Sequence, residues 1–510
     1  MRTENSIKNS ISAIISNVFV MLLGFVIQTV FVKTLGKEYL GIVGLFNNII
    51  SCLAIVELGI GPAIVSNLYK PLADRDEEKI KTLLGYYKKC YTAIGILVFA
   101  IGIVIMPFLD YFVKTSLTFE NFGGIYLIFM LFVADSAISY FYSYKRSIIQ
   151  ADQKSRVINN AHLICYTLMI VLQALTLILT RNYILFLVLK IVFRFLENVV
   201  LSRYVDKNYK FLKGSAKKIE RKVKVDIFKK VKGLIYHKIG VYVVSATDNI
   251  IISAFLGVGL VGVYSNYYLI INSLYTLYCQ IFASIMASVG NLIFTETKER
   301  NYNIYKKVMF LDFWIYAFSG AVLYCIMTPF VKVWLGDDFL LSNSVLAILV
   351  INFYMLGMRS SIGIFKEAAG IFHEDRFIPI IEAIIKIVAS VVFVQFFGVF
   401  GVFLGTFFSC LIAVFYSLPH FVFKRLFDRK KRYYYMLYFK YIIIAAIGVL
   451  LTSAVYQLTA LALPDSDLLR LIVSVAIAAV VPNAFFILLF HKTEEFKYYK
   501  DMALSKLKRK

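Results

Sequence analysis

Long apolar stretches recur along almost the whole chain, separated by short polar segments. Each stretch is about 20 residues long and apolar on most of its faces, which is the length that an α-helix needs to cross a bilayer. Strands of a membrane barrel run to about ten residues and alternate between apolar and polar positions, so the pattern favours helices. The stretches lie at approximately 11–32, 42–64, 91–112, 124–144, 158–180, 183–203, 239–257, 261–289, 308–331, 345–366, 378–396, 399–423, 439–460 and 469–490. We therefore predict an all-α integral membrane protein with 14 transmembrane helices.

The composition excludes a soluble enzyme. Of the 510 residues, 60% are hydrophobic and 17% are charged, and the mean hydropathy is +0.75. Soluble domains have roughly 45–50% apolar and about 25% charged residues. The first stretch is followed by Lys33-Thr34-Leu35-Gly36 and not by a small-residue cleavage site, so we expect a retained helix. The six cysteines are dispersed and no metal-binding motif occurs, so we expect no disulfide, metal or cofactor.

The basic residues lie mainly on one side of the predicted helices. The formal net charge is +24, from 55 Lys and Arg against 31 Asp and Glu. With the N-terminus inside, 46 of these cations fall in inner segments, six in outer segments and three inside the spans. This asymmetry follows the positive-inside rule and predicts cytoplasmic N and C termini. Because the cations are spread over eight short segments without one basic, aromatic face, we expect no nucleic-acid partner.

The longest inner segment, 205–238, is strongly basic and amphipathic. Its apolar residues recur every three or four positions, at Ile219, Val223, Ile227, Val231 and Leu234. We expect either an interfacial helix that rests on anionic membrane lipid or a solvated linker.

An internal repeat divides the chain. Leu35-Gly36 followed by Gly41 recurs as Leu256-Gly257 followed by Gly262, at an offset of 221, and Lys145 maps onto Lys366 at the same offset. The predicted domains are an N-lobe with spans 1–6 (1–204), a cytoplasmic linker (205–238), a C-lobe with spans 7–12 (239–423), and spans 13–14 with a basic tail (424–510). In transporters with such repeats the substrate site lies between the halves, so we expect a cavity there.

Several polar side chains fall inside the predicted spans. An ionisable residue at the centre of a bilayer costs roughly 2.5–3.5 kcal/mol, so each needs a partner, a hydrated cavity or a position near a helix end. Lys190 and Arg194 share one helical face with Glu197, and Arg359 lies at an inner helix end. These residues indicate either a cationic cavity for an anionic head group or neutralised structural charges. The amides within the predicted spans that serve either sugar hydroxyls or helix–helix contacts are Asn47, Asn48, Asn249 and Asn266.

Several local strings resemble one transporter family. They are Glu57-Leu-Gly-Ile-Gly61, Asn67-Leu-Tyr-Lys-Pro-Leu-Ala73, Thr247-Asp-Asn-Ile-Ile-Ile-Ser253, Gly262-Val-Tyr-Ser-Asn-Tyr-Tyr268 and Ala368-Ala-Gly-Ile-Phe-His-Glu-Asp-Arg376. In this order they resemble Wzx-type polysaccharide flippases of the multidrug/oligosaccharidyl-lipid/polysaccharide exporter superfamily. The resemblance covers most of spans one to twelve.

The resemblance implies a V-shaped pair of six-helix lobes with two additional C-terminal helices, in a bacterial cell membrane. It implies a flippase, not an enzyme, that moves undecaprenyl-pyrophosphate-linked oligosaccharide repeat units to the outer leaflet by alternating access, for capsular or exopolysaccharide synthesis. Polysaccharide polymerase and glycosyltransferases are the implied partners. On this view Lys190, Arg194 and Arg359 bind the pyrophosphate. Candidate sites for a coupling proton or sodium ion are Glu57, Asp135 and Asp248.

Other functions remain as alternatives. A lipid II flippase of peptidoglycan synthesis shares the 14-helix plan. A drug or cation antiporter of the same superfamily would have a mostly acidic cavity, and the intramembrane cations argue against it. No Gly-x4-Gly-Lys-Ser/Thr motif occurs, and every outer loop is short, so neither an ATPase nor a membrane polymerase is expected.

Overall fold

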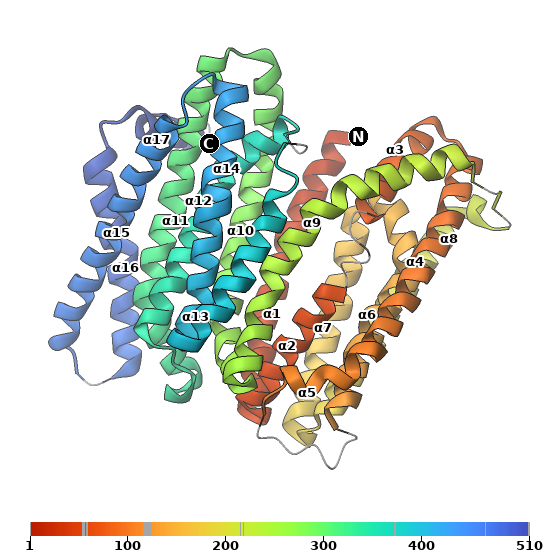
Figure 1. Ribbon diagram of the computed structural model, residues 1–510, viewed down its shortest axis with the longest axis horizontal. Helices are drawn as coiled ribbons and strands as arrows, with labels where there is room; N and C mark the ends of the chain where they lie inside the picture. The colour runs from red at the N-terminus through yellow and green to blue at the C-terminus, as the bar shows by residue number, and fades with distance from the viewer. Residues whose placement is uncertain are drawn as a thin grey trace. The chain divides into compact units, whose positions relative to one another are not determined.

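The protein is all-helical in the computed structural model. The structure describes residues 2–53, 57, 60–115, 124–214, 216–217, 219–371, 374–464 and 466–507, and no strand occurs among them. The helices of Figure 1, with short 3₁₀ and π segments marked η, are α1 (Arg2–Leu35), α2 (Lys37–Leu53), α3 (Ile60–Asp74), α4 (Glu77–Ile105), η2 (Met106–Phe108), α5 (Leu109–Phe112), α6 (Gly124–Ala151), α7 (Ser155–Thr180), α8 (Tyr183–Asn208), η3 (Lys210–Leu212), α9 (Arg221–Leu256), α10 (Val258–Thr295), α11 (Lys298–Leu335), η4 (Asp337–Phe339), α12 (Asn343–Ala368), α13 (Ile378–Ser409), η5 (Cys410–Val414), α14 (Phe415–Val422), η6 (Phe423–Phe427), α15 (Arg432–Leu461), α16 (Asp467–Phe490) and α17 (Glu494–Leu507). The all-α prediction is confirmed.

Many of these helices can cross a membrane. Within the described residues, nine helical stretches are long and apolar enough: Ile15–Leu35, Glu77–Phe112, Gly124–Ala151, Ser155–Thr180, Lys298–Leu335, Asn343–Ala368, Ile378–Phe427, Arg432–Leu461 and Asp467–Phe490. The predicted span 183–203 corresponds to α8, which is long enough but carries Lys190, Arg194 and Glu197 within its apolar stretch. The number of 14 spans stays a prediction.

One of the nine stretches contains two of the predicted spans. Gly398 has φ 56° and ψ −136°, which breaks the helix between the predicted spans 378–396 and 399–423. The chain folds back there, since a Cβ built on Gly401 would lie 2.1 Å from the carbonyl oxygen of Phe393. The absence of a side chain therefore lets the two arms of α13 pack backbone to backbone.

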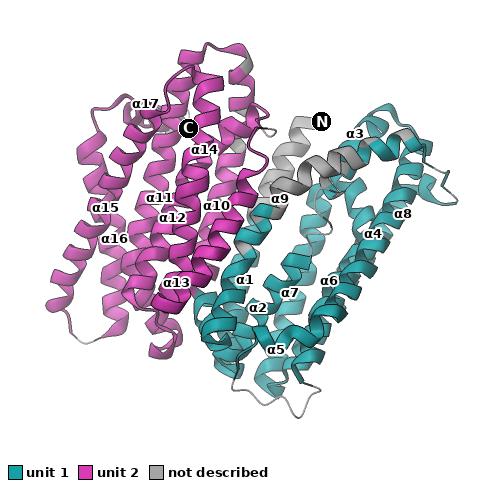
Figure 2. Ribbon diagram, viewed as in Figure 1, with its two compact units in different colours: residues 1–266 teal, residues 267–510 magenta. Residues whose placement is uncertain are grey.

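The helices form two compact units, Met1–Asn266 and Tyr267–Lys510 (Figure 2). In unit 1, α6 packs against α3, α4 and α8, while α7 packs against α1 and α8. In unit 2, α11 packs against α12, α15 and α16. The boundaries predicted for the lobes and the linker stay predictions.

The basic linker differs from the expectation of a separate interfacial helix. Its helical part and the predicted span 239–257 form one continuous helix, α9, which ends at Leu256 and is followed by Gly257 with a φ of 101°. The apolar side chains of Ile219, Val223 and Ile227 pack on the buried core of unit 1, which there includes Leu201. That part of the apolar face therefore contacts protein, and the choice between an interfacial helix and a solvated linker stays a prediction.

The glycine pair of the internal repeat forms a close helix crossing in unit 1. A Cβ built on Gly41 would lie 1.9 Å from the carbonyl oxygen of Val258, and one built on Gly262 would lie 1.8 Å from that of Lys37. Only glycine allows α2 and the start of α10 to approach this closely. The two copies of the repeated motif therefore contact each other.

An aromatic cluster attaches α15 and α16 to α11 in unit 2. Phe313 stacks on Tyr441 with ring centroids 4.5 Å apart and also contacts Phe490. The indole nitrogen of Trp314 donates a hydrogen bond to the Asn483 side chain over 3.0 Å. The two C-terminal apolar helices therefore belong to the core of this unit.

Candidate functional site

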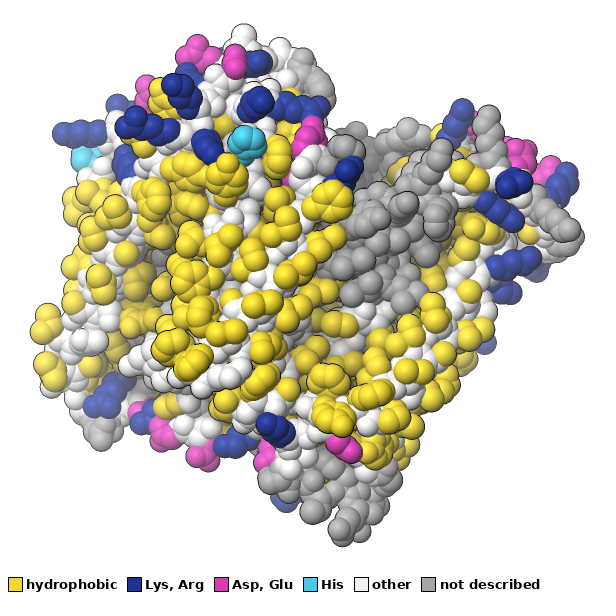
Figure 3. Space-filling view, in the orientation of Figure 1, with side chains coloured by type: hydrophobic (Ala, Val, Ile, Leu, Met, Phe, Trp, Pro, Cys, Tyr) yellow, Lys and Arg dark blue, Asp and Glu magenta, His cyan; other side chains and the backbone are white. Residues whose placement is uncertain are grey.

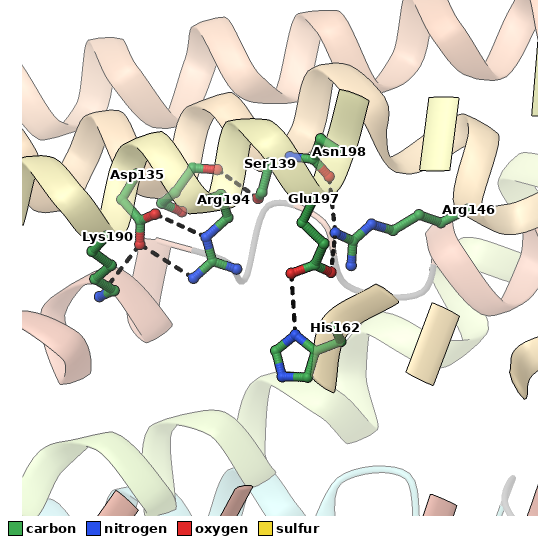
Figure 4. A network of polar contacts seen from close by, with 9 residues as sticks. Asp135, Ser139, Arg146, His162, Lys190, Arg194, Glu197 and Asn198 are labelled. Carbon is green, nitrogen blue, oxygen red and sulfur yellow. Dashed lines mark hydrogen bonds and ion pairs between the residues drawn. The ribbon is translucent and has the colours of Figure 1, made fainter. Parts of the chain in front are cut away.

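Two cations share one carboxylate inside unit 1. The Nε atom of Arg194 donates to Asp135 over 2.8 Å, and a second guanidinium nitrogen lies 3.3 Å from the other carboxylate oxygen (Figure 4). The ammonium of Lys190 lies 3.3 Å from the same carboxylate. Lys190 and Arg194 are four residues apart on α8, so they face Asp135 on α6 together. The sequence prediction that the two cations lie together thus agrees with the structure, and their carboxylate partner comes from another helix.

A second carboxylate lies one helical turn further along α8. Glu197 accepts a hydrogen bond of 2.8 Å from Arg146 of α6, and its other oxygen lies 3.1 Å from Nδ1 of His162 on α7. Arg146 also donates to the side chain of Asn198 over 2.9 Å. Three helices therefore contribute to a network that follows the facing sides of α6 and α8 (Figure 4).

The carboxylates of this network are more deeply buried than the cations. The side chains of Asp135 and Glu197 are only 9% and 7% exposed, whereas those of Arg194 and His162 are 37% and 43% exposed. Three basic side chains, those of Lys190, Arg194 and Arg146, face two carboxylates. An anion that reaches this site would meet the basic groups first, with the carboxylates behind them. The arrangement is suited to binding an anionic group.

The network is set well inside its helix. Arg194 follows the first residue of α8 by 11 positions, which is ~17 Å along the helix axis at about 1.5 Å per residue. At the far end of α8, the side chains of Asp206 and Ser202 accept hydrogen bonds of 2.7 Å and 2.6 Å from Lys145 of α6. The charged pairs therefore extend from the end of α8 into its interior.

Unit 2 has a smaller charged cluster of the same kind. Arg359 of α12 donates to Glu382 of α13 over 3.0 Å, and the side chain of Glu382 is the more buried of the two. Lys386 lies four residues further along α13 and is buried. Asp312 of α11 accepts a hydrogen bond of 2.9 Å from the backbone of Ser361. From sequence spacing Arg359 had no acidic neighbour, and the structure provides one from the next helix.

The predicted amides are located in unit 1 and not beside the charged network. Asn266 is fully buried and accepts a hydrogen bond of 2.9 Å from Gln28 of α1. Asn48 donates to the carbonyl of Ala246 on α9 over 3.1 Å. Asn249 is buried and Asn47 is exposed. Asn48 and Asn266 thus bond neighbouring helices.

The three acids predicted for ion coupling have different surroundings. Asp135 forms ion pairs with two cations, Lys190 and Arg194. Glu57 lies beside the hydroxyl groups of Tyr91 and Tyr140, and Asp248 is partly buried on α9. The structure brings only Asp135 of the three into the basic network.

Sequence reasoning missed Arg146, His162 and Asn198. Arg146 belongs to an inner segment in which every cation is already explained by membrane topology. His162 has no metal-binding or catalytic partner within reach along the sequence. The available signal was helical spacing, because Arg146 follows Asp135 by 11 residues, which is close to three full turns on one face of α6.

Comparisons with known proteins identify one family for this chain. The model of the family described as polysaccharide biosynthesis protein matches residues 6–289. No curated protein matches the sequence.

Three solved structures show the relationship of the fold. The lipid II flippase MurJ in an inward closed conformation is 15% identical over 95% of this chain and 99% of its own, with a TM-score of 0.69. An inward-facing multidrug resistance MATE family transporter of the MOP superfamily is 15% identical over 80% of this chain and 96% of its own, with a TM-score of 0.62. A MOP superfamily transporter from Pyrococcus furiosus, described by the reverse polarity of its binding pocket, is 16% identical over 84% of this chain and 97% of its own, with a TM-score of 0.54. The fold is that of MOP superfamily transporters.

Proposed function

The chain belongs to the polysaccharide biosynthesis protein family, and from this premise we propose that it is a lipid-linked oligosaccharide flippase. The proposed substrate is an undecaprenyl-pyrophosphate-linked oligosaccharide repeat unit, moved from the cytoplasmic to the outer leaflet for capsular or exopolysaccharide synthesis. The proposed setting is a bacterial cell membrane with both termini cytoplasmic, where polymerase and glycosyltransferases are the functional partners.

The observation that carries this proposal is the exposure of the basic groups around two buried carboxylates. A pyrophosphate in a low-dielectric environment needs several fixed cations, and Arg binds phosphate oxygens through two parallel hydrogen bonds. Arg194 is partly exposed and offers donors beyond those that contact Asp135. A mostly cationic drug would be repelled by the same groups, which makes the antiporter alternative the weaker one.

Partner exchange explains how the site can work reversibly. Without substrate, Asp135 neutralises part of the charge of Arg194 and Lys190, so the cations are stable inside the membrane. When a pyrophosphate binds, the cations turn from the carboxylate to the phosphate oxygens. Asp135 can then take up a proton or a sodium ion, which would link transport to an ion gradient. Glu57 and Asp248 are the other candidates for this coupling. Flipping that is indifferent to proton, sodium and voltage gradients would contradict the coupling.

Surface display of the polysaccharide tests the role of the cations. We expect Arg194→Ala and Arg359→Ala to lose display while each variant still reaches the membrane, because a pyrophosphate then lacks a charged hydrogen-bond donor. Arg203→Ala is the matched control, since Arg203 is an exposed cation on the same helix α8 and lies outside the network. Normal display from both variants, at wild-type protein levels, would refute the cationic site.

A further inference from the structure

A second basic site lies in unit 2, where α14 and η6 end and α15 begins. A pocket of about 580 Å³ is present there, and its lining includes the cations Lys424, Arg429, Lys430, Lys431 and Arg432. Asp428 is the one acidic residue in the lining. Figure 3 shows Lys and Arg side chains gathered at the upper end of this unit, above a band of hydrophobic side chains.

The acids near this pocket offset only part of its positive charge. Asp428 lies 3.8 Å from Lys298, which is not part of the lining. Glu299 lies 3.5 Å from Arg429. Among the residues that the structure describes, no carboxylate contacts Lys424, Lys430 or Arg432. The pocket therefore has a local excess of positive charge that the protein itself does not neutralise.

Aromatic rings hold two of the cations in place. The ammonium of Lys431 lies 4.0 Å from the centre of the Tyr416 ring, and the guanidinium of Arg429 lies 4.4 Å from that of Tyr302. Such contacts restrict the long side chains without neutralising them. The basic groups thus have less conformational freedom to lose when they bind an anion.

Exposed apolar side chains occur on both sides of the pocket along the chain, in η5 and α14 before the basic loop and in α15 after it. Ile412 in η5 and Tyr416 in α14 are 56% exposed each, and on α15 Tyr433, Met436 and Phe439 are exposed directly after the basic loop. The spacing of the α15 residues is helical, so they form one stripe. A soluble anion would use only the basic pocket, whereas a phospholipid would use the pocket and the apolar stripes together.

We propose that this pocket binds the phosphate headgroup of an anionic phospholipid from the leaflet on the basic side of the membrane, with the acyl chains along η5, α14 and α15. Basic pockets between membrane helices are known to select acidic headgroups. Membrane topology alone explains why cations occur in this loop, but it requires neither a pocket nor the stacking of Lys431 and Arg429 on aromatic rings. The proposal concerns a lipid site and is independent of the transported substrate.

Lipid binding to the purified full-length protein tests the proposal. The triple variant Lys424→Gln, Lys430→Gln, Arg432→Gln removes the three cations without carboxylate contacts. The matched control is Lys492→Gln, Lys497→Gln, Lys500→Gln, which removes three exposed cations from the same unit outside the pocket. Dissociation constants for phosphatidylglycerol, phosphatidylcholine and inorganic pyrophosphate are measured by native mass spectrometry, and the thermal unfolding midpoint checks that each variant folds.

We expect the triple variant to bind phosphatidylglycerol on the order of a hundredfold more weakly, since each surface cation contributes roughly fivefold. The control variant should bind phosphatidylglycerol like the wild-type protein. Phosphatidylcholine should bind weakly to the wild-type protein and to both variants. Equal phosphatidylglycerol affinity in the triple variant and the control would overturn the site. Displacement of phosphatidylglycerol by an equal concentration of inorganic pyrophosphate would overturn the assignment to a lipid, since the acyl chains would then contribute nothing.

Discussion

At the residue scale, Asp135 is the group on which the charged network of unit 1 depends. It is buried and contacts two cations, and Asp135 is the carboxylate that forms an ion pair with each of them. Removing one partner of a buried ion pair leaves an uncompensated charge, which is more destabilising than the loss of the attraction itself. The consequences of substitution should therefore differ between the carboxylate and its cations.

We predict that Asp135→Asn lowers the free energy of unfolding by about 3 kcal/mol, because Lys190 and Arg194 then both lack a carboxylate. Arg194→Ala should be milder, at about 1 kcal/mol, since Lys190 still neutralises Asp135 and the lost side chain is partly exposed. Thermal unfolding of the purified variants, followed by circular dichroism of the helices, compares the two. A larger loss in Arg194→Ala than in Asp135→Asn would be inconsistent with this account.

At the element scale, glycine decides how closely the helices approach. The crossing of α2 with the start of α10 has backbone atoms where a Cβ of Gly41 or Gly262 would lie. The sequence indicated these glycines as a repeat, but spacing alone did not reveal that the two copies contact each other. Gly363 in α12 is different, because a Cβ built there has no atom within 4 Å.

We expect Gly41→Ala and Gly262→Ala each to lower the free energy of unfolding by about 2 kcal/mol, since α2 and α10 would have to separate. Gly363→Ala is the matched control and should leave the unfolding midpoint unchanged or slightly higher, because alanine favours the helix. The same thermal unfolding measurement applies. Unchanged midpoints in all three variants would argue against a close crossing.

At the element scale too, hydrophobic periodicity predicted where the helices lie in the sequence better than it predicted what each helix face contacts. Apolar length is a local property, so the pattern located helices such as α11 and α12 and separated the two arms of α13 at Gly398. It did not reveal that the linker helix continues into the next span as α9, because amphipathic and fully apolar segments carry different signals. Nor could the pattern alone tell a lipid-facing stripe from one that packs on protein, as at Ile227.

At the scale of the whole molecule, the charged residues could be predicted as a set but not as pairs. Helical spacing brought Lys190, Arg194 and Glu197 together on one face. Their partners Asp135 and Arg146 come from a helix about 50 residues away, and only tertiary packing selects them. The membrane-spanning fold and the family are consistent with the proposed flippase, for which this network is the proposed site of an anionic head group.

Transport of a defined lipid in proteoliposomes tests that central claim most directly. The full-length protein is reconstituted with a fluorescent undecaprenyl-pyrophosphate-linked oligosaccharide, and the rate at which the head group crosses the bilayer is compared with that of lipid II. We predict that the oligosaccharide lipid crosses faster than lipid II, and that Arg194→Ala slows it by roughly tenfold or more, whereas Arg203→Ala does not. No flipping of the oligosaccharide lipid, equal or faster flipping of lipid II, or an unchanged rate in Arg194→Ala would contradict the account.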